Sequence, residues 1–463
     1  MYKFPSKQIA ATDFGMPLGL KLDPDNRWVK KAETIPWEEI EVRYAALFKN
    51  RKGNVAKPLR LALGALLIQT QHQYPDSEVP LQIRETPCLQ YFCGLPEYKD
   101  ELPFDPSLMV YFRKRLTPEI LGEINELIIA KAGKQEDLPP DDDDDAPPND
   151  GTLIVDATCA PQNIRYPQDT SLLNEARENL EKMIDELHDP ADGEKPRTYR
   201  KNARRDYLNF AKNRNKSGKL IRKAVGKQLR YIKRDLQIVE AYLQNGKTLP
   251  RKRLERLETV KKLYEQQSLM FKKRTRKVDD RIVSLSQPWI RPIVRGKAKA
   301  KCEFGAKLEI SVVDGFARLE HTSFDPYNES QNLKEIIARY RARTGRYPER
   351  VLADKIYRNR DNLAFCKERG IRLSGKPLGR PKKGAVVDKK QLRADEADRV
   401  EVERKFSHAK GSFGLGLVRA RLRGTGETAI ALSIVALNIA HVGRILRTVL
   451  RWLFTREKFV VVQ

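Results

Sequence analysis

The sequence predicts a mixed α/β sheet flanked by helices, preceded by a helical N-terminal region and interrupted by a long basic helical insertion. Three observations predict it. Apolar residues recur at helical spacing over residues 1–135, and two apolar runs, LIVD at 153–156 and VLAD at 351–354, are typical of buried strands. Residues 201–300 hold 30 Lys and Arg against 8 Asp and Glu, an excess of 30 − 8 = 22. The order of elements favours one sheet with helices on its faces.

Residues 1–135 are expected to form a small helical domain. The segment KPLRLALGALLIQTQHQY has apolar residues at helical spacing, and Asp105 or Ser107 is placed to cap a helix that carries Met109 and Phe112. A DNA-binding helix-turn-helix and a plain helical bundle both fit this region.

Residues 136–150, which include DDDDD, are expected to form an extended linker. Prolines and adjacent like charges oppose burial, so a spacer is favoured over weak cation binding.

Residues 165–292 are expected to form the helical insertion. From Val225 to Leu243 the apolar residues follow steps of 4, 3, 4, 3 and 4, which is the spacing of a coiled-coil seam. A second helix after the turn NGKTLP completes a hairpin with a basic outer surface. Trp289 either stacks on a DNA base or packs against the core, and packing is the more common fate of tryptophan.

Residues 151–164 and 293–450 are expected to form the sheet domain, and residues 451–463 a C-terminal tail. Asp314-Gly315 is a hairpin signal between two strands. Charged residues interrupt the apolar segment AIALSIVALNIAHVGRILRTVLRWLF, which therefore predicts a helix that closes a core and not a membrane span.

The formal charge of +27 calls for a polyanionic partner. Nucleic acid is favoured over anionic membrane, because clustered Lys and Arg displace many counterions from phosphates. The five cysteines form no paired CxxC motifs, which argues against a structural zinc site.

Acidic residues follow both apolar runs. Asp156 and Asp354 are expected at the carboxyl ends of neighbouring strands, and a later helix offers Glu401 or Glu403 as a third acid. Converging carboxylates suit Mg²⁺ or Mn²⁺, and two such ions catalyse phosphodiester chemistry. An isolated Asp at a strand end is more often a turn or cap residue. Two such strands, a later acid on a helix and a strongly basic chain together favour a metal-dependent nucleic-acid enzyme.

The chain resembles the DDE transposases of bacterial insertion sequences, within the group related to insertion sequence five. The resemblance is carried by LQYFCGLPEYKDELPFDPSLMVYFRKRL, VDATCAPQNIRYPQDTSLLNEARE, VLADKIYRNRDN, GIRLSGKPLGRPKK and RVEVERKFSHAKGSFGLGLVRARLRGTGETAIALSIVALNIA. It implies an RNase H-like catalytic fold whose triad is Asp156, Asp354 and Glu403, holding two Mg²⁺ or Mn²⁺ ions per active site.

The family's third motif has tyrosine, arginine, glutamate and lysine. Arg399, Glu403 and Lys410 keep its last two gaps, which favours Glu403 over Glu401, while Glu396 stands at the tyrosine position. Arg399 and Lys410 are expected to hold DNA phosphates; a surface pair between Arg399 and Glu403 is the alternative from spacing alone.

The resemblance implies an enzyme that binds terminal inverted repeats as a homodimer, cleaves the ends with metal-activated water, and joins the 3′ hydroxyl to target DNA. A cytoplasmic, nucleoid-associated location is expected. A nuclease without strand transfer, an inactive or domesticated DNA-binding protein and a generic RNA-binding protein are the alternatives; the last lacks RRM and KH signatures.

Overall fold

The protein was analysed as a computed structural model that describes residues 1–5, 9–49, 53–133, 148–294, 302–379 and 388–460. The chain divides into two compact units. The first holds residues 1–161, 307–323 and 327–463, and the second holds residues 162–306 and 324–326. The predicted DDDDD linker segment lies outside the described residues. The predicted domain boundaries stay predictions, and each unit is described by itself.

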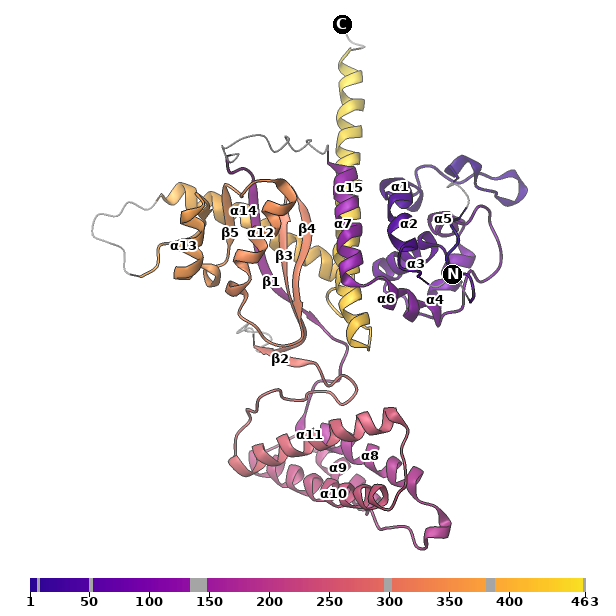
Figure 1. The fold of residues 1–463 in the computed structure, drawn as a ribbon, viewed down its shortest axis with the longest axis vertical. Coiled ribbons are helices and arrows are strands. Elements are labelled where there is room, and N and C mark those ends of the chain that lie inside the picture. Colours follow the sequence, from indigo (N-terminus) through magenta and orange to yellow (C-terminus); the bar gives the residue numbers. More distant parts are fainter. Residues whose placement is uncertain (6–8, 50–52, 134–147, 295–301, 380–387, 461–463) are drawn as a thin grey trace. The chain divides into compact units, whose positions relative to one another are not determined.

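The N-terminal part of the first unit is helical (Figure 1). Its helices are α1 (Arg27–Thr34), α2 (Trp37–Ala45), α3 (Leu59–His72), α4 (Glu78–Glu85), α5 (Pro87–Phe92), α6 (Leu108–Arg115) and α7 (Pro118–Ala132), after two short 3₁₀ helices at Ala11–Asp13 and Pro17–Gly19. Helix α3 is buried on almost every side, which explains its nearly unbroken apolar sequence. Proline occupies the first turn of α5 and α7, where its missing N–H is not needed.

The sheet has the order β2-β3-β1-β5-β6, with β4 paired to β3. Its strands are β1 (Thr152–Pro161), β2 (Arg291–Val294), β3 (Cys302–Val313), β4 (Phe316–Ser323), β5 (Arg350–Ala353) and β6 (Arg372–Leu373). Strands β1, β5 and β6 are parallel, while β3 and β4 are antiparallel. This mixed sheet is compatible with an RNase H-like domain.

The β3–β4 hairpin turns at the predicted dipeptide. Asp314 and Gly315 both have positive φ, at 49° and 77°, as a two-residue hairpin turn requires. A Cβ on Gly315 would lie 2.4 Å from Nε2 of His441, so glycine is needed here for space as well as conformation.

Helices cover both faces of the sheet. Leu153 and Val155 of β1 share an apolar cluster with α12 (Leu333–Thr344) and α13 (Arg360–Glu368), reached through the 3₁₀ helices η4 (Glu329–Gln331) and η5 (Lys355–Tyr357). Helix α14 (Lys389–Ser412) contacts β1 and β5 from the other face, where Lys410 donates a hydrogen bond to Thr158 of β1. Strand residues alternate between faces, so Asp156 points to the α14 face.

Helix α15 (Arg423–Val460) is the longest helix described, and it continues through residues 451–460 of the predicted tail. It lies alongside α7 and also contacts α1, α3, α6 and β4 (Figure 1). Residues Arg423–Thr448 are long and apolar enough to cross a membrane, but 61% of the apolar window is buried inside the protein. Within the described residues α15 therefore serves as the core helix that joins the N-terminal helices to the sheet.

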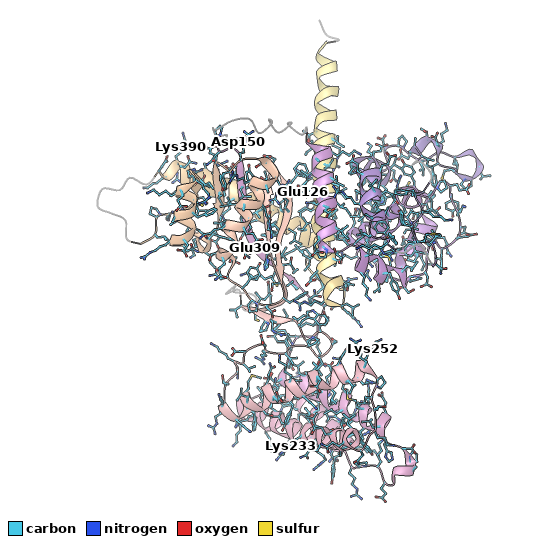
Figure 2. The ribbon with its side chains drawn as sticks, viewed as in Figure 1. Glu126, Asp150, Lys233, Lys252, Glu309 and Lys390 are labelled. Carbon is cyan, nitrogen blue, oxygen red and sulfur yellow. The ribbon has the colours of Figure 1, made fainter. Side chains whose placement is uncertain are left out.

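The second unit is built from α8 (Asp169–Leu187), α9 (Arg200–Lys212), α10 (Gly218–Gln244) and α11 (Arg251–Lys273), with a short 3₁₀ helix at Pro190–Asp192. The predicted seam of α10 lies in its apolar core, which it shares with α8 and α11. Lys and Arg side chains such as Lys233 and Lys252 are exposed on its surface (Figure 2).

Candidate active site

Asp156 and Asp354 lie next to each other at the end of the β1–β5 ladder. The parallel register pairs Val155 with Ala353, so the two aspartates follow at equivalent positions. We expected β1 to end at Asp156, and this was wrong: β1 continues to Pro161, while β5 ends at Ala353. Strand β1 continues because β3 is its neighbour on the other side. The alternation of side chains turns both aspartates toward the α14 face.

Burial sets the electrostatics of Asp156. The pKa of this carboxyl is raised to about 6, mainly by burial and also by nearby Asp354 and Glu329. The Ala157 N–H and the Arg399 guanidinium oppose this rise. The Ala157 N–H donates to Asp156 Oδ1 at 2.8 Å. Asp354 is exposed, and its Oδ1 accepts a hydrogen bond from the Lys355 N–H at 2.6 Å.

Arg399 connects Asp156 to Glu403. Its Nη1 lies 3.6 Å from Asp156 Oδ2, and its Nη2 lies 3.2 Å from Glu403 Oε1. The i,i+4 pair inferred from spacing is therefore present, but it also reaches the first strand. The carboxylates of Asp156 and Glu403 thus share one cation supplied by the chain itself.

Ion pairs hold α14 against the sheet. The buried carboxylate of Asp395 accepts hydrogen bonds from both terminal nitrogens of Arg372 on β6, at 2.6 and 2.9 Å. Arg350 on β5 lies 3.5 Å from Asp395 and 2.8 Å from Asp398. Arg399 and Glu403 follow Asp395 on the same helix, so the ion pairs of Asp395 and Asp398 also position Arg399 and Glu403 relative to the ends of β1 and β5.

Lys410 also faces β1. Its Nζ donates to Thr158 Oγ1 at 2.9 Å, and Thr158 lies two residues after Asp156, on the same face of the strand. Arg399 and Lys410 therefore both contact side chains of β1, and Glu403 pairs with Arg399 one turn away on the same helix.

A buried polar network supports the turn that follows Asp354. Glu309 on β3 is fully buried, and its Oε1 accepts a hydrogen bond from the Tyr357 hydroxyl at 2.9 Å while Asn332 donates to its other oxygen. Tyr357 closes η5, which begins immediately after Asp354. We did not predict Glu309 as a site residue. The signal was a glutamate inside the apolar run LEISVV.

Lys307 and Glu329 form a second pair close by, at 2.6 Å. The Glu329 carboxylate contributes to the raised pKa of Asp156. Asp156 therefore has a nearby acid that is far away from it in the sequence.

Trp289 was predicted either to stack on a DNA base or to pack against the core. Trp289 belongs to the second unit and is partly buried; its indole N–H is buried with no hydrogen-bond partner among the residues described. Its proposed stacking on DNA stays a prediction. His408 of α14 packs edge-on against Phe413, with ring centroids 4.9 Å apart.

The donor set fits a hard divalent cation in chemistry and only in part in position. Asp156 and Asp354 offer carboxylate oxygens side by side. Burial, and to a smaller extent the neighbouring carboxylates, raises the pKa of Asp156, the more buried of the two. Across the described ranges, however, no three His, Cys, Asp or Glu side chains are grouped closely enough to hold an ion. Arg399 lies between the carboxylates of Asp156 and Glu403.

Comparison with protein families now bears on this geometry. Residues 351–440 match the model described as a transposase DDE domain, and residues 17–115 match a second transposase domain. Two separate segments of the chain are therefore similar to transposase domains. The DDE match includes Asp354, Arg399, Glu403 and Lys410, while Asp156 precedes it. The narrower assignment to the group related to insertion sequence five stays a prediction.

One curated relative is an uncharacterized protein, ORF8 in the nfe locus of Rhizobium meliloti. It is 28% identical over 159 residues, which cover 34% of this chain and 73% of the relative. No solved structure matches the chain. The transposase domains therefore rest on the two family matches, and the roles of single residues rest on the geometry above.

Proposed function

We propose that this protein is a DNA transposase that cleaves the ends of its element and joins them to target DNA. One observation carries the proposal. Asp156 and Asp354 stand in register on parallel strands and face α14, where Arg399 links Asp156 to Glu403. Asp354 and Glu403 lie within the segment that matches a transposase DDE domain, and Asp156 precedes it. Together these three acids supply the kind of carboxylates that two-metal phosphoryl transfer uses.

The charge distribution supports double-stranded DNA as the partner. The helices of the second unit expose Lys and Arg along their outer surfaces, as Lys233 and Lys252 illustrate (Figure 2). Contacts of this kind bind phosphates without reading sequence. We propose that this surface binds transposon ends or target DNA, that a homodimer bridges two ends, and that the enzyme works in the cytoplasm beside the nucleoid.

Asp156, Asp354 and Glu403 would hold two Mg²⁺ or Mn²⁺ ions. When bound, such ions lower the pKa of the attacking hydroxyl group and neutralise charge that develops on the phosphodiester. For Glu403 to join the aspartates, Arg399 must leave the space between them. Its planar guanidinium is suited to take a DNA phosphate instead, with Lys410 as a second phosphate contact.

The two reactions are the same displacement with different nucleophiles. Water attacks phosphorus at the element end, the bond from phosphorus to the 3′ oxygen breaks, and a 3′ hydroxyl is released. That hydroxyl then attacks a target phosphodiester, which forms a new bond from phosphorus to oxygen and displaces the target's own 3′ hydroxyl. Asp156 and Asp354 serve both steps from a fixed position on the sheet.

The test uses the full chain, Mg²⁺, a DNA fragment that carries the sequences flanking its gene, and a target plasmid. We expect cleavage and joining by the natural protein. Asp156→Asn, Asp354→Asn and Glu403→Gln should each lower both activities on the order of a thousandfold or more, since each removes a group that acts on the reacting phosphate. DNA affinity should change less than about threefold, because the basic surface is untouched.

Asp361→Asn is the matched control, because Asp361 is an exposed acid only a few residues beyond Asp354. It should retain both activities. Cleavage that survives Asp156→Asn refutes the triad. Cleavage without joining by the natural protein identifies a nuclease, and binding without cleavage identifies a DNA-binding protein that has lost its chemistry.

A further inference from the structure

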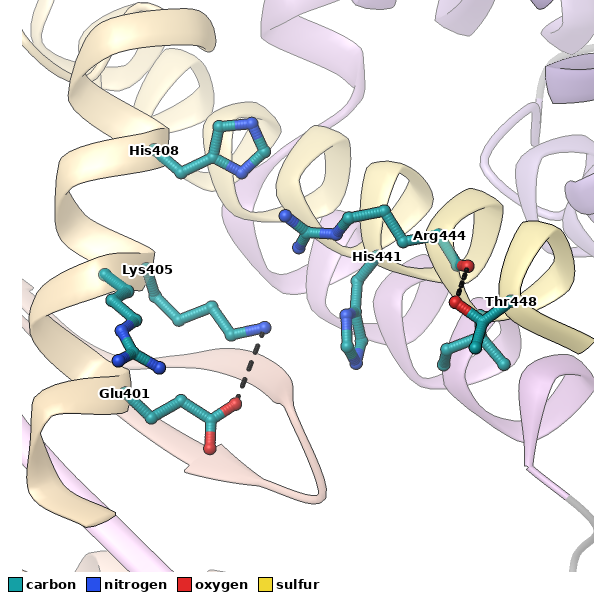
Figure 3. Close-up of a pocket in the computed structure, with 8 residues that line it drawn as sticks. Glu401, Lys405, His408, His441, Arg444 and Thr448 are labelled. Carbon is teal, nitrogen blue, oxygen red and sulfur yellow. Dashed lines mark hydrogen bonds and ion pairs between the residues drawn. The ribbon is translucent and has the colours of Figure 1, made fainter. Parts of the chain in front are cut away.

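A pocket of about 440 Å³ opens between α14 and α15 in the first unit. Figure 3 shows Glu401, Lys405 and His408 of α14 facing His441, Arg444 and Thr448 of α15. Arg404 also lines the pocket. The active-site residues of α14 are Arg399, Glu403 and Lys410, so the pocket lies on a different face of the same helix.

The pocket holds more positive than negative charge. Arg404, Lys405 and Arg444 are cations, and Glu401 is the single acid among the lining residues. Lys405 is buried; its ammonium donates to the Gly315 carbonyl and lies 3.9 Å from Glu401. Arg404 and Arg444 are exposed, and neither guanidinium has an ion pair or hydrogen bond within the described part of the chain.

Burial and nearby positive charge lower the pKa values of titratable groups in this pocket. The pKa of His441 is lowered to about 4, mainly by burial and also by the positive charges of Lys405 and Arg444. The pKa of His408 is lowered by burial and by the same two cations, and the pKa of Lys405 falls to about 8, mainly through burial. Both imidazoles are thus neutral at pH 7. Of the three cations, Lys405 pairs with Glu401, whereas Arg404 and Arg444 have no anionic partner among the described residues.

We propose that this pocket binds a backbone phosphate of DNA, at a position separate from the phosphate that undergoes reaction. Arg404 and Arg444 reach it from the two helices and supply guanidinium donors in the geometry that phosphate oxygens accept. His408 supplies a neutral N–H donor, while the His441 ring hydrogen-bonds to the Asp314 backbone and lines the pocket. Lys405, held by the Gly315 carbonyl, contributes its charge from the base of the pocket.

This assignment rests on the proposed function for the identity of the partner, since DNA is the phosphate source. It adds a contact that the sequence motif does not contain. Residues 401, 404, 405 and 408 follow the 3-to-4 spacing of one helical face, and residues 399, 403 and 410 belong to another. A duplex bound at the pocket would therefore contact α14, the helix that also carries Glu403.

The experiment measures binding of the full chain to a 30-base-pair duplex in EDTA, as a function of salt concentration. The double variant Arg404→Ala/Arg444→Ala should weaken binding about threefold to tenfold at 0.15 M salt and lower the salt slope by about one, the loss of one phosphate contact. Arg447→Ala is the matched control: Arg447 is exposed on α15, does not line the pocket, and donates to the Gly443 carbonyl. It should change affinity less than twofold.

A second measurement follows the imidazole resonances of His408 and His441 by NMR, with duplex DNA, inorganic phosphate and pyrophosphate as separate titrants. Duplex DNA should raise the pKa of both histidines, because a bound phosphate favours their charged form. If millimolar phosphate or pyrophosphate raises the pKa and DNA does not, the pocket is a small-anion site and the inference is wrong.

The inference is also wrong if Arg404→Ala/Arg444→Ala binds DNA with the same affinity and salt slope as Arg447→Ala. These outcomes are separable from failure of the proposed function. If the natural protein cuts and joins DNA and the double variant binds DNA normally, only the phosphate-binding role of the pocket is refuted. A protein that never cuts DNA, but loses affinity in the double variant, overturns only the transposase chemistry.

Discussion

One buried carboxylate in the second, helical unit differs from those beside the candidate active site in the first unit, which we call the sheet unit. In the sheet unit, Glu309 accepts hydrogen bonds from Tyr357 and Asn332, and Asp395 accepts two from Arg372. In the helical unit, Asp235 of α10 is fully buried, yet neither of its oxygens has a hydrogen-bond partner among the described residues.

The difference matters because a buried carboxylate without partners prefers to be neutral. Burial, together with the nearby Glu181 carboxylate, raises the pKa of Asp235 to about 7, whereas bonds from Arg372 and Gln391 overcome burial and lower the pKa of Asp395. Partnered acids hold α14 and η5 in place beside the candidate active site, and the unpartnered one costs stability in a unit where no chemistry is proposed.

Glu309→Ala should produce the largest effect. It leaves the Tyr357 hydroxyl and the Asn332 amide buried without their acceptor, so we expect a loss of about 3 kcal/mol in the free energy of unfolding. Cleavage of element ends should fall about tenfold or more, because the η5 turn positions Asp354. Calorimetry and the cleavage assay measure the two effects.

Glu335→Ala is the control for this prediction. Glu335 lies on α12, and its exposed carboxylate pairs with Arg339 at 2.5 Å. Removing an exposed pair of this kind changes stability by less than about 1 kcal/mol. If Glu309→Ala melts like Glu335→Ala and cleaves like the natural protein, the network does not support the site.

Local patterns predicted the strand pairing at the candidate active site and the β3–β4 hairpin. Two apolar runs that each lead into an aspartate predicted neighbouring strands, and the structure pairs Val155 with Ala353 in a parallel ladder. Asp314-Gly315 predicted the hairpin, since positive φ at both positions favours such residues. Each of these signals lies within a few residues of the feature that it predicts.

The remaining features depend on residues far apart in the chain. Glu309 and Tyr357 are 48 residues apart, and Arg372 and Asp395 are 23 apart. No periodicity records such pairs, because they form only after the sheet and its helices have packed. The extension of β1 beyond Asp156 has the same origin, since it depends on β3 as a neighbour.

Asp395→Ala should have the next largest effect. It leaves Arg372 and Arg350 without a buried carboxylate, and we expect a loss of about 2 kcal/mol, less than for a fully buried pair because both arginines are partly exposed. Asp398→Ala is the control: Asp398 pairs with Arg350 at 2.8 Å but is 45% exposed, so its loss should cost less than about 1 kcal/mol. Equal melting temperatures would contradict the role assigned to Asp395.

Asp235→Asn should have the smallest effect, and it should be a gain that depends on pH. Asp235 faces Glu181 and Arg177 of α8, Arg234 of its own helix and Arg200 of α9. Its pKa is about 7 in the folded protein and near 4 in the unfolded chain, so the natural protein loses stability as pH rises from about 4 to 7. Asparagine does not ionise and avoids this loss.

The variant should therefore melt close to the natural protein at pH 4.5 and at a higher temperature at pH 8, with a gain of about 1–2 kcal/mol. Hydrogen exchange of the α10 amides at the two pH values locates the gain in the helical unit. A difference between the two proteins that is the same at both pH values would mean that Asp235 stays ionised in the folded state. The contrast between partnered and unpartnered carboxylates would then fail, because the arginines around Asp235 would already neutralise it.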